Sequence, residues 1–221
     1  HHHTRSSSRV NPPSRLKLGY KRAGFDFIQL LEHDGLHDST NWLQHCNVDD
    51  EPGTFVVFQG SEVYVKHDVF NSYDINSIGY MPRDVPKTDT DDIIGKIRRA
   101  GKVSYLCHPG RWLEQTETIR GIPGLEDLHG LEVINGARAC DESQPDNPDE
   151  WRGFYMPVWD YCLSQGLRFW GFCGSDWHGG ADVITRGKPL VAHNRVLAKS
   201  LTQEHILEAV KEGRFYVTTG V

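Results

Sequence analysis

Short apolar runs alternate with amphipathic segments along the chain, and this alternation predicts the main elements. Runs of strand length lie at residues 25–31, 54–58, 63–65, 103–107, 131–134, 169–172 and 215–218. Segments with helical patterning lie at residues 15–22, 88–100, 149–164 and 202–212. Strands that are separated by helices favour a parallel sheet or a barrel. We therefore expect an α/β fold.

Start and stop signals support two of these helices. Asn11-Pro12-Pro13 combines a capping residue with proline in the first turn, and Gly24 follows the predicted end. In the helix at 88–100, acidic residues crowd the first turn, basic residues lie near the end, and Gly101 follows. Both segments are therefore expected to be helices that connect strands.

Length and composition narrow the class of protein. The chain has 221 residues, and 24 Lys and Arg against 30 Asp and Glu give a net charge of −6. This suits one domain, residues 1–221, of α/β-barrel size. No apolar run reaches the roughly 20 residues of a membrane span, and the N-terminus lacks a signal-peptide core. We expect a cytoplasmic protein with no membrane segment, with a signal in an upstream segment as the alternative, and no non-specific nucleic-acid binding.

Histidine is the unusual residue in the composition. The chain has 12 His, which prompts a search for metal ligands. Its five Cys are scattered and form no CxxC pair, so a disulfide framework or a Cys-type zinc site is not expected. Cys107 lies in an apolar run directly before His108, and strand alternation predicts that it points into the core, away from any site formed there.

The imidazoles and carboxylates of interest follow the predicted strands. His33, Glu62 and His108 each come at or just after an apolar run, and Asp176 and His178 follow the run at 169–172. The carboxyl ends of parallel strands converge on one rim, where sites are assembled. Residues two apart in an extended segment project to the same side. Imidazoles with a bridging carboxylate suit Zn²⁺, Mn²⁺ or Fe²⁺.

Five motifs in this order resemble the PHP (polymerase and histidinol phosphatase) family. They are HHHTRSS (1–7), LEHD (31–34), GSE (60–62), HPG (108–110) and GSDWH (174–178). The resemblance covers nearly the whole chain and implies a distorted (β/α)7 barrel that hydrolyses phosphoesters with two or three divalent metal ions. The segment EGRFYVTTG (212–220) is similar to the end of a subgroup that also contains carbamate-hydrolysing enzymes.

The resemblance implies ligands for up to three ions. The first would be held by His1, His3, Glu62 and Asp176, the second by Glu62, His67 and His108, and the third by His33 and His178. Two departures weaken the third site: residues 7–9 (SSR) stand where the family often has Asp or His, and Glu32 replaces an Asp. We therefore expect a two-metal centre, or three ions with a weak third site.

The site class implies a mechanism. A hydroxide shared by two ions would attack a small anionic phosphoester, and His33 or His178 would protonate the leaving group if the third ion is absent. Arginine binds phosphate oxygens in a bidentate manner, and we expect anion clamps at strand-end loops from Arg9, Arg111 and Arg138. Behind these groups, Glu132 and Asn135 are expected to orient His108.

Several alternatives stay open from the sequence. The same centre could hydrolyse a carbamate or another carboxylic ester, or the chain could be a non-catalytic, metal-binding PHP-like module. His1–His3 could be the remnant of a purification tag. Under either interpretation a strand should precede these histidines, so we expect the natural protein to extend upstream.

Overall fold

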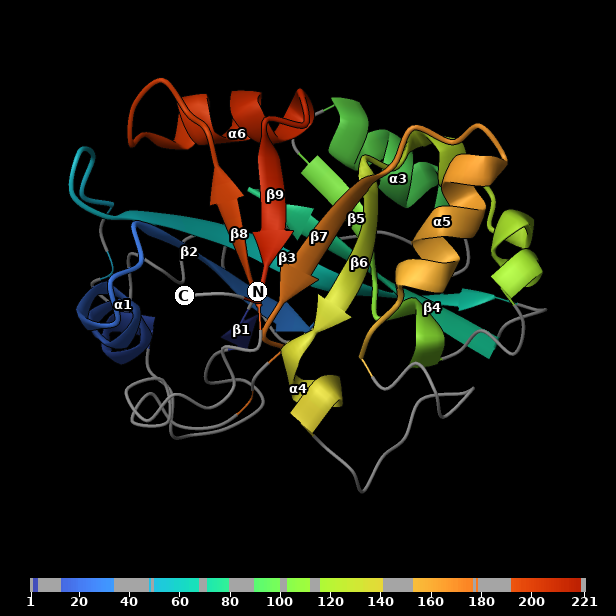
Figure 1. The fold of residues 1–221 in the computed structure, drawn as a ribbon, viewed down its shortest axis with the longest axis horizontal. Coiled ribbons are helices and arrows are strands. Elements are labelled where there is room, and N and C mark those ends of the chain that lie inside the picture. Colours follow the sequence, from blue (N-terminus) through green and yellow to red (C-terminus); the bar gives the residue numbers. More distant parts are fainter. Residues whose placement is uncertain are drawn as a thin grey trace.

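A seven-stranded sheet organises the molecule, and its strands follow one another in chain order. The computed structural model describes residues 2–3, 13–33, 48, 50–67, 71–79, 90–99, 103–111, 116–140, 153–176, 178 and 192–219. The strands are β1 (His2–His3), β2 (Phe27–His33), β3 (Val56–His67), β4 (Asn71–Ile78), β5 (Val103–Cys107), β6 (Gly130–Asn135) and β7 (Trp170–Gly174). All neighbouring pairs are parallel except those made by β4, which is antiparallel to β3 and β5. The sheet curls from β1 round to β7 (Figure 1).

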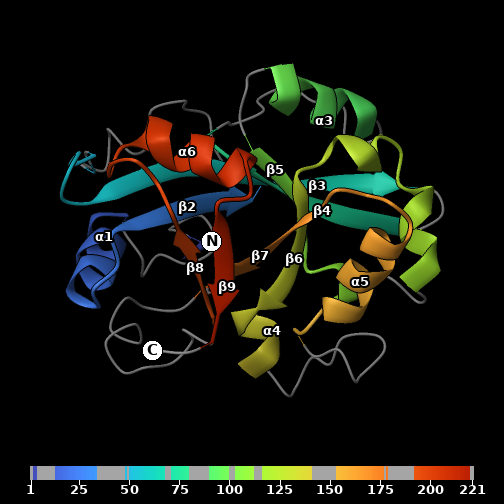
Figure 2. The same cartoon turned by 45° about the horizontal axis from the view of Figure 1, so that its top comes forward.

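Helices and a small second sheet cover the two faces of this sheet. The helices are α1 (Pro13–Arg22), α3 (Thr90–Arg99), α4 (Gly136–Cys140), α5 (Met156–Ser164) and α6 (Gln203–Lys211). Short 3-10 turns span Pro109–Arg111, Thr116–Gly121 and Leu125–Asp127. β8 (His193–Val196) pairs with β9 (Phe215–Thr218) in a separate two-stranded antiparallel sheet, and α6 lies between these two strands in the chain. Figure 2 shows α1 beside β2, and β8 and β9 beside β7.

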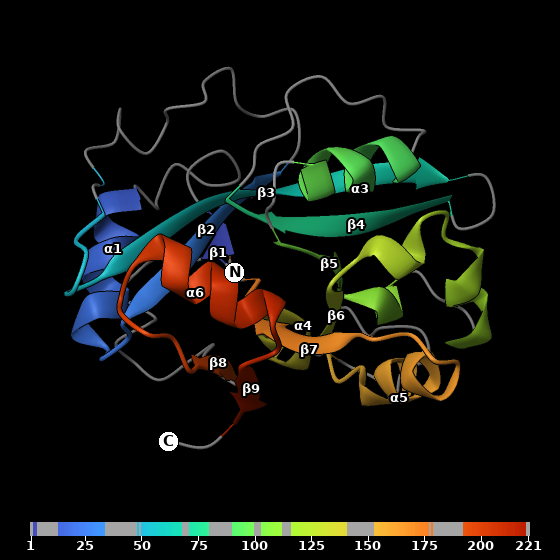
Figure 3. The ribbon, with the colours of Figure 1, turned by 90° about the horizontal axis from the view of Figure 1, so that it is seen from above.

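The apolar core is divided by the sheet. On the outer face, α3 and α5 pack against β3, β4 and β6 through buried residues such as Ile97 and Val158. On the inner face, Ile206 and Val210 of α6 pack with aromatic side chains of β3, β5 and β7. Figure 3 shows α6 within the curl of the sheet and α3 outside it. The sheet is therefore packed on its outer face by α3 and α5 and on its inner face by α6.

Most predicted elements are present, with shifted ends. The run at 103–107 and the run at 215–218 form strands with those bounds, and the last helix begins after Thr202, whose side chain accepts a hydrogen bond from the His205 backbone N–H. The helix predicted at 149–164 begins at Met156, and residues 149–152 lie outside the described part of the chain. The α/β class is thus confirmed.

The largest departure concerns β3 and β4. We expected two short strand pieces at 54–58 and 63–65, but β3 runs unbroken through Val56–His67. A Cβ at Gly60 would lie 2.1 Å from the Ser77 carbonyl oxygen, so this glycine permits a close approach of β4 rather than a turn. β4 itself was not predicted.

A closed barrel of seven βα units stays a prediction. Within the described residues, β1 and β7 are the edges of the sheet, and the antiparallel β3–β4 pair replaces one helical crossover. The structure therefore supports the coarser description, a curled, half-barrel α/β sheet. Among the helices that the structure describes, none is both long enough and apolar enough to cross a membrane.

Candidate metal centre

The carboxyl ends of β2, β5 and β7 converge beside Glu62 of β3. His33 ends β2 and lies opposite Glu62 in the parallel β2–β3 register. His108 directly follows β5, and Asp176 lies two residues beyond β7. The strand residues that directly precede His108 and Asp176 are buried in the core, which fixes where these polar groups emerge.

Glu62, His108 and Asp176 form an inner cluster. All three are buried: their residues are 2%, 0% and 6% exposed. The Nε2 atom of His108 lies 3.0 Å from Oε1 of Glu62 and 3.9 Å from Oδ2 of Asp176. Ligand atoms that share one ion at bonds of about 2.0–2.2 Å lie about 3–3.5 Å apart, so Glu62 and His108 have the spacing for a common cation. Asp176, at 3.9 Å from His108, would have to move closer to join them.

The backbone conformation of two residues brings this cluster together. His108 and Asp176 have φ values of 24° and 46°, and they are the two non-glycine residues with positive φ among those described. A left-handed residue just after a strand interrupts the alternation of side chains between the two faces. Such strain often occurs at functional sites, where the surrounding structure must hold it.

One prediction is corrected by this geometry. We expected Cys107 to point away from the site, but its Sγ lies within 4.8 Å of ligand atoms of Glu62 and His108. The expectation assumed regular alternation, and the positive φ of His108 breaks that alternation. Burial raises the pKa of the Cys107 thiol well above its usual range, and the nearby charges of Glu132 and Glu62 raise it further.

The electrostatics of the cluster centre on His108. Burial by itself lowers the pKa of His108, but the hydrogen bond to Glu62 and the charges of Glu62, Asp176 and Asp74 outweigh it and raise the pKa to about 9. The imidazole is therefore protonated at neutral pH when no ion is bound, and it partly compensates the buried carboxylates. A divalent cation would take over this role and displace the proton.

Asp74 is a further candidate that the sequence analysis missed. It lies on β4, its Oδ2 is 3.9 Å from Nδ1 of His108, and it is buried. It therefore faces the ring nitrogen opposite the one that faces Glu62. At 3.9 Å it is beyond hydrogen-bond distance and acts on the imidazole through its charge, which favours a proton on Nδ1. Its only sequence signal is the alternation of polar with apolar residues in 72–76.

His33 and His178 form an outer pair. Their Nε2 atoms lie 3.1 Å apart, and the rings are stacked with centroids 5.4 Å apart. Nδ1 of His178 lies 3.0 Å from the Asp176 carbonyl oxygen, which makes Nδ1 the protonated nitrogen and leaves the Nε2 lone pair facing His33. The two Nε2 atoms can share either one proton or one cation.

The other predicted residues lie partly outside the described structure. His1 and Arg9 are not among the described residues, and only the backbone is described for His3, His67, Arg111 and Arg138. His3 pairs with Leu31, next to the end of β2 that carries His33. His67 is the last residue of β3, five residues beyond Glu62, so about 16 Å of strand separates them.

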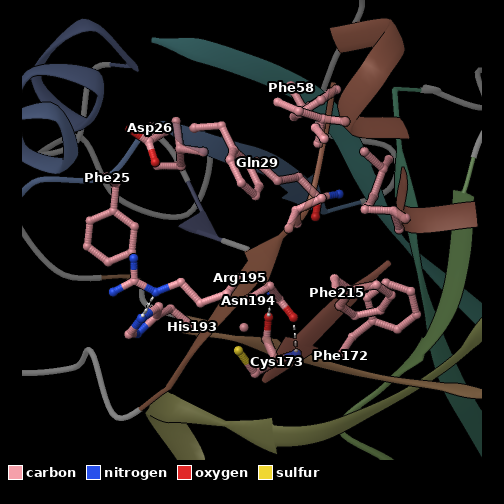
Figure 4. Close-up of a pocket in the computed structure, with 18 of the residues that line it drawn as sticks. Phe25, Asp26, Gln29, Phe58, Phe172, Cys173, His193, Asn194, Arg195 and Phe215 are labelled. Atoms are coloured by element: carbon pink, nitrogen blue, oxygen red, sulfur yellow. Dashed lines mark hydrogen bonds between the residues drawn. The ribbon is translucent and has the colours of Figure 1, made fainter. Parts of the chain in front are cut away.

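A large cavity adjoins this region on the inner side of the sheet. Its volume is about 1040 Å³, and it lies between β2, β7 and the two-stranded β8–β9 sheet. Figure 4 shows aromatic side chains such as Phe58 and Phe172 on its walls, with Gln29 and Arg195 among the polar groups. The wall also includes Ser175, the residue before Asp176. None of the proposed ligands is among the described residues that line this space, and Ser175 is the lining residue next to the candidate centre in the chain.

Comparison with solved structures identifies the fold. A two-domain protein from Bacteroides vulgatus, containing a predicted PHP-like metal-dependent phosphoesterase, has a TM-score of 0.63 and 21% identity, over 99% of this chain and 63% of that one. A protein from Bifidobacterium adolescentis, provisionally assigned as a metal-dependent phosphoesterase, has a TM-score of 0.53 and 17% identity, over 96% and 95%. PsfC from Pseudomonas syringae has a TM-score of 0.59 and 11% identity, over 98% and 88%.

These likenesses define the class of fold as PHP-like, which confirms the resemblance inferred from the five motifs. At these identities they concern the fold alone, and the chain spans 63% of the length of the Bacteroides protein. No protein-family model matches the chain, and no curated protein matches its sequence.

Proposed function

We propose that the chain is a metal-dependent hydrolase that acts on a small anionic phosphoester, on a scaffold that is a distorted (β/α)7 barrel. The observation that carries this proposal is the inner cluster, in which Glu62 and Asp176 approach the same nitrogen of the buried His108. Buried carboxylates are costly unless they are paired or coordinate a metal. The PHP-like fold of the neighbouring structures supports the same class.

The donor set fits divalent ions such as Zn²⁺, Mn²⁺ or Fe²⁺. Glu62, His108 and Asp176 would form the inner site, with His1 and His3 as further ligands on the family pattern. His67 is left out of this site, because about 16 Å of β3 separates it from Glu62, which is more than the two side chains can span. His33 and His178 would form an outer site, which is more exposed and so more weakly held. When bound, such ions lower the pKa of a coordinated water and stabilise negative charge on the substrate.

The protein's own residues would bind the substrate and move protons. With no ion between His33 and His178, one proton is shared by their Nε2 atoms, and this exposed pair can protonate the leaving group. Arg9, Arg111 and Arg138 are the proposed anion clamps, because a guanidinium matches phosphate oxygens in a bidentate manner. His108 is too deeply buried to contact the leaving group, and its role would be to bind the inner ion.

Metal analysis followed by an activity screen tests the proposal. The purified chain is analysed for bound metals and then assayed with p-nitrophenyl phosphate, bis(p-nitrophenyl) phosphate and an aryl carbamate. We expect bound divalent metal, hydrolysis of a phosphoester, and a loss of about a hundredfold or more in Glu62→Gln. The control Glu51→Gln changes an exposed glutamate that pairs with Lys17 and Lys21 and should keep full activity.

Each alternative has its own outcome in this screen. Hydrolysis of the carbamate alone would replace the phosphoesterase by the carbamate hydrolase considered above. A chain that binds divalent metal but hydrolyses none of the three compounds would be the non-catalytic, metal-binding module. A chain that binds no divalent metal would show that the proposal is wrong.

A further inference from the structure

Two buried polar residues of β6 lie between the strands that carry His108 and Asp176. Glu132 and Asn135 are both 0% exposed. β6 is the central neighbour of β5 and β7, so residues at its carboxyl end lie between the two residues with positive φ. Neither Glu132 nor Asn135 is among the proposed ligands.

A bulge places both side chains in one network. In a regular strand, residues three apart point to opposite faces. The β6–β7 register pairs Glu132 with Phe172 but Ile134 with Cys173, so an extra residue is inserted between them. Bulges of this kind re-aim side chains next to active sites. Here the bulge allows Asn135 Nδ2 to donate a hydrogen bond to Glu132 Oε2 at 2.9 Å.

The network reaches both positive-φ residues. Oε2 of Glu132 also accepts a hydrogen bond from the His108 backbone N–H at 2.9 Å, and the Cys107 Sγ lies 3.6 Å from the same oxygen. The second hydrogen of Asn135 Nδ2 points to Oδ2 of Asp176, at 3.1 Å. One carboxylate thus holds the backbone of His108, while one amide holds the side chain of Asp176.

We propose that Glu132 and Asn135 act as a positioning pair that keeps His108 and Asp176 converged on the inner metal site. The proposal rests on the function proposed above, and it extends the expected role of these two residues from His108 to Asp176. The hydrogen bonds of Glu132 and Asn135 hold His108 and Asp176, whose backbone conformations are sparsely populated, in place before an ion binds. Outer residues of this kind commonly change metal affinity by about 10- to 100-fold.

Metal affinity and ligand geometry in Asn135→Ala test the pair. We expect Zn²⁺ to bind about 10- to 100-fold more weakly than in the wild type, measured by competition with a chelator. The visible absorption spectrum of the Co²⁺-loaded protein should also shift, because Asp176 loses its fixed position. A merely structural role would lower the melting temperature without moving this spectrum.

Asn194→Ala is the matched control. Its side-chain amide also makes two hydrogen bonds, to the backbone N–H and carbonyl of Cys173, but none to a proposed ligand. It should lower stability and leave Zn²⁺ affinity and the Co²⁺ spectrum unchanged. Equal losses of affinity in the two variants would overturn the proposal. If Asn135→Ala does not fold, Glu132→Leu replaces it, because leucine keeps much of the side-chain volume and removes the acceptor oxygens; unchanged affinity in that variant would likewise overturn the proposal.

A metal-independent measurement separates this proposal from the proposed function. In the metal-free protein, hydrogen exchange of the His108 backbone amide should be slow in the wild type and at least tenfold faster in Glu132→Leu. A wild type that binds no Zn²⁺ but keeps this difference would refute the metal site and leave the positioning of His108 intact. A wild type that binds Zn²⁺ without this difference would refute the positioning pair alone.

Discussion

At the scale of single residues, the two ring nitrogens of His108 face different carboxylates and can therefore have different roles. Nε2 lies close to Glu62 and Nδ1 faces the more distant Asp74. In the metal-free state both carboxylates favour the imidazolium. In a metal-bound state Nε2 would be the ligand, and Asp74 would be the group that keeps the proton on Nδ1.

This arrangement predicts an order of effects on the His108 pKa. Glu62→Gln should lower the pKa from about 9, because it removes the hydrogen-bonded carboxylate that most favours the charged ring. Asp74→Asn should lower it less, since Asp74 makes the weaker contribution at 3.9 Å. An NMR titration of the imidazole in metal-free protein measures both shifts. Glu51→Gln serves as the control, and a Glu62→Gln protein whose His108 still titrates near 9 would contradict the assigned interaction.

Some site residues can be predicted from the sequence and others cannot, for a geometric reason. His33 and His108 end apolar runs, so their place at the strand ends follows from the pattern alone. Asp74 lies in a stretch that alternates polar and apolar residues, and such a stretch gives no sign that its polar face is the buried one. Cys107 and His108 lie on the same side because the φ of His108 is positive, and no periodicity encodes that φ.

At the scale of elements, the close contact of β3 with β4 explains why one long strand stands where two pieces were expected. Gly60 pairs with Ile78 in the antiparallel register, and its missing side chain leaves room for the Ser77 carbonyl. Glu62 lies two residues further on the same strand. A break at Gly60 would therefore uncouple Glu62 from the core residues that fix β3.

Alanine substitutions at two glycines should thus have opposite effects. Gly60→Ala places a Cβ 2.1 Å from a backbone oxygen and 2.5 Å from a Leu31 methyl group, and we expect a loss of about 3 kcal/mol, the upper range for overpacking. Gly95→Ala lies in α3, where the nearest atom is the flexible end of Arg99 at 3.0 Å, and we expect a gain of about 0.5–1 kcal/mol from helix propensity. Urea unfolding measures both. Similar stability changes in the two variants would show that β4 gives way at Gly60.

At the scale of the whole molecule, the curl of the sheet is what turns separate strand ends into one site. His33 and His178 are 145 residues apart in sequence and in contact across the curl, and Tyr20 of α1 similarly reaches Ser175, with its hydroxyl 3.4 Å from Oγ. The alternation of strands and helices predicts a parallel α/β sheet but not how far it closes. How far the sheet closes depends on the packing of α6, β8 and β9 against its inner face. These elements are remote in sequence from most of the strands they cover.

An ion bound at the inner site would cross-link β3 to the segments that follow β5 and β7, so metal should stabilise the entire fold. Binding to the native state alone adds about 2.7 kcal/mol when the free ion is at a hundred times its Kd, which is about 5–10 °C in Tm for a chain of this length. We expect EDTA to lower the Tm of the metal-loaded wild type by this amount, and Zn²⁺ or Mn²⁺ to restore it. His108→Ala should abolish the response, whereas His33→Ala, which alters only the outer pair, should retain most of it.

The pH dependence of this stabilisation has a definite sign. The folded-state pKa of His108, about 9, lies above its ordinary value of 6.5, so protonation of the metal-free protein contributes stability that is present below pH 6.5 and lost as the pH rises through 9. The ion must displace that proton, and its stabilising effect should therefore grow from pH 6.5 to 9. Thermal melts with and without Zn²⁺ at pH 6.5, 7.5 and 8.5 measure the trend. A metal-induced rise in Tm that is equal at all three values would mean that the ion binds away from His108, and no rise at any of them would mean that the cluster holds no ion.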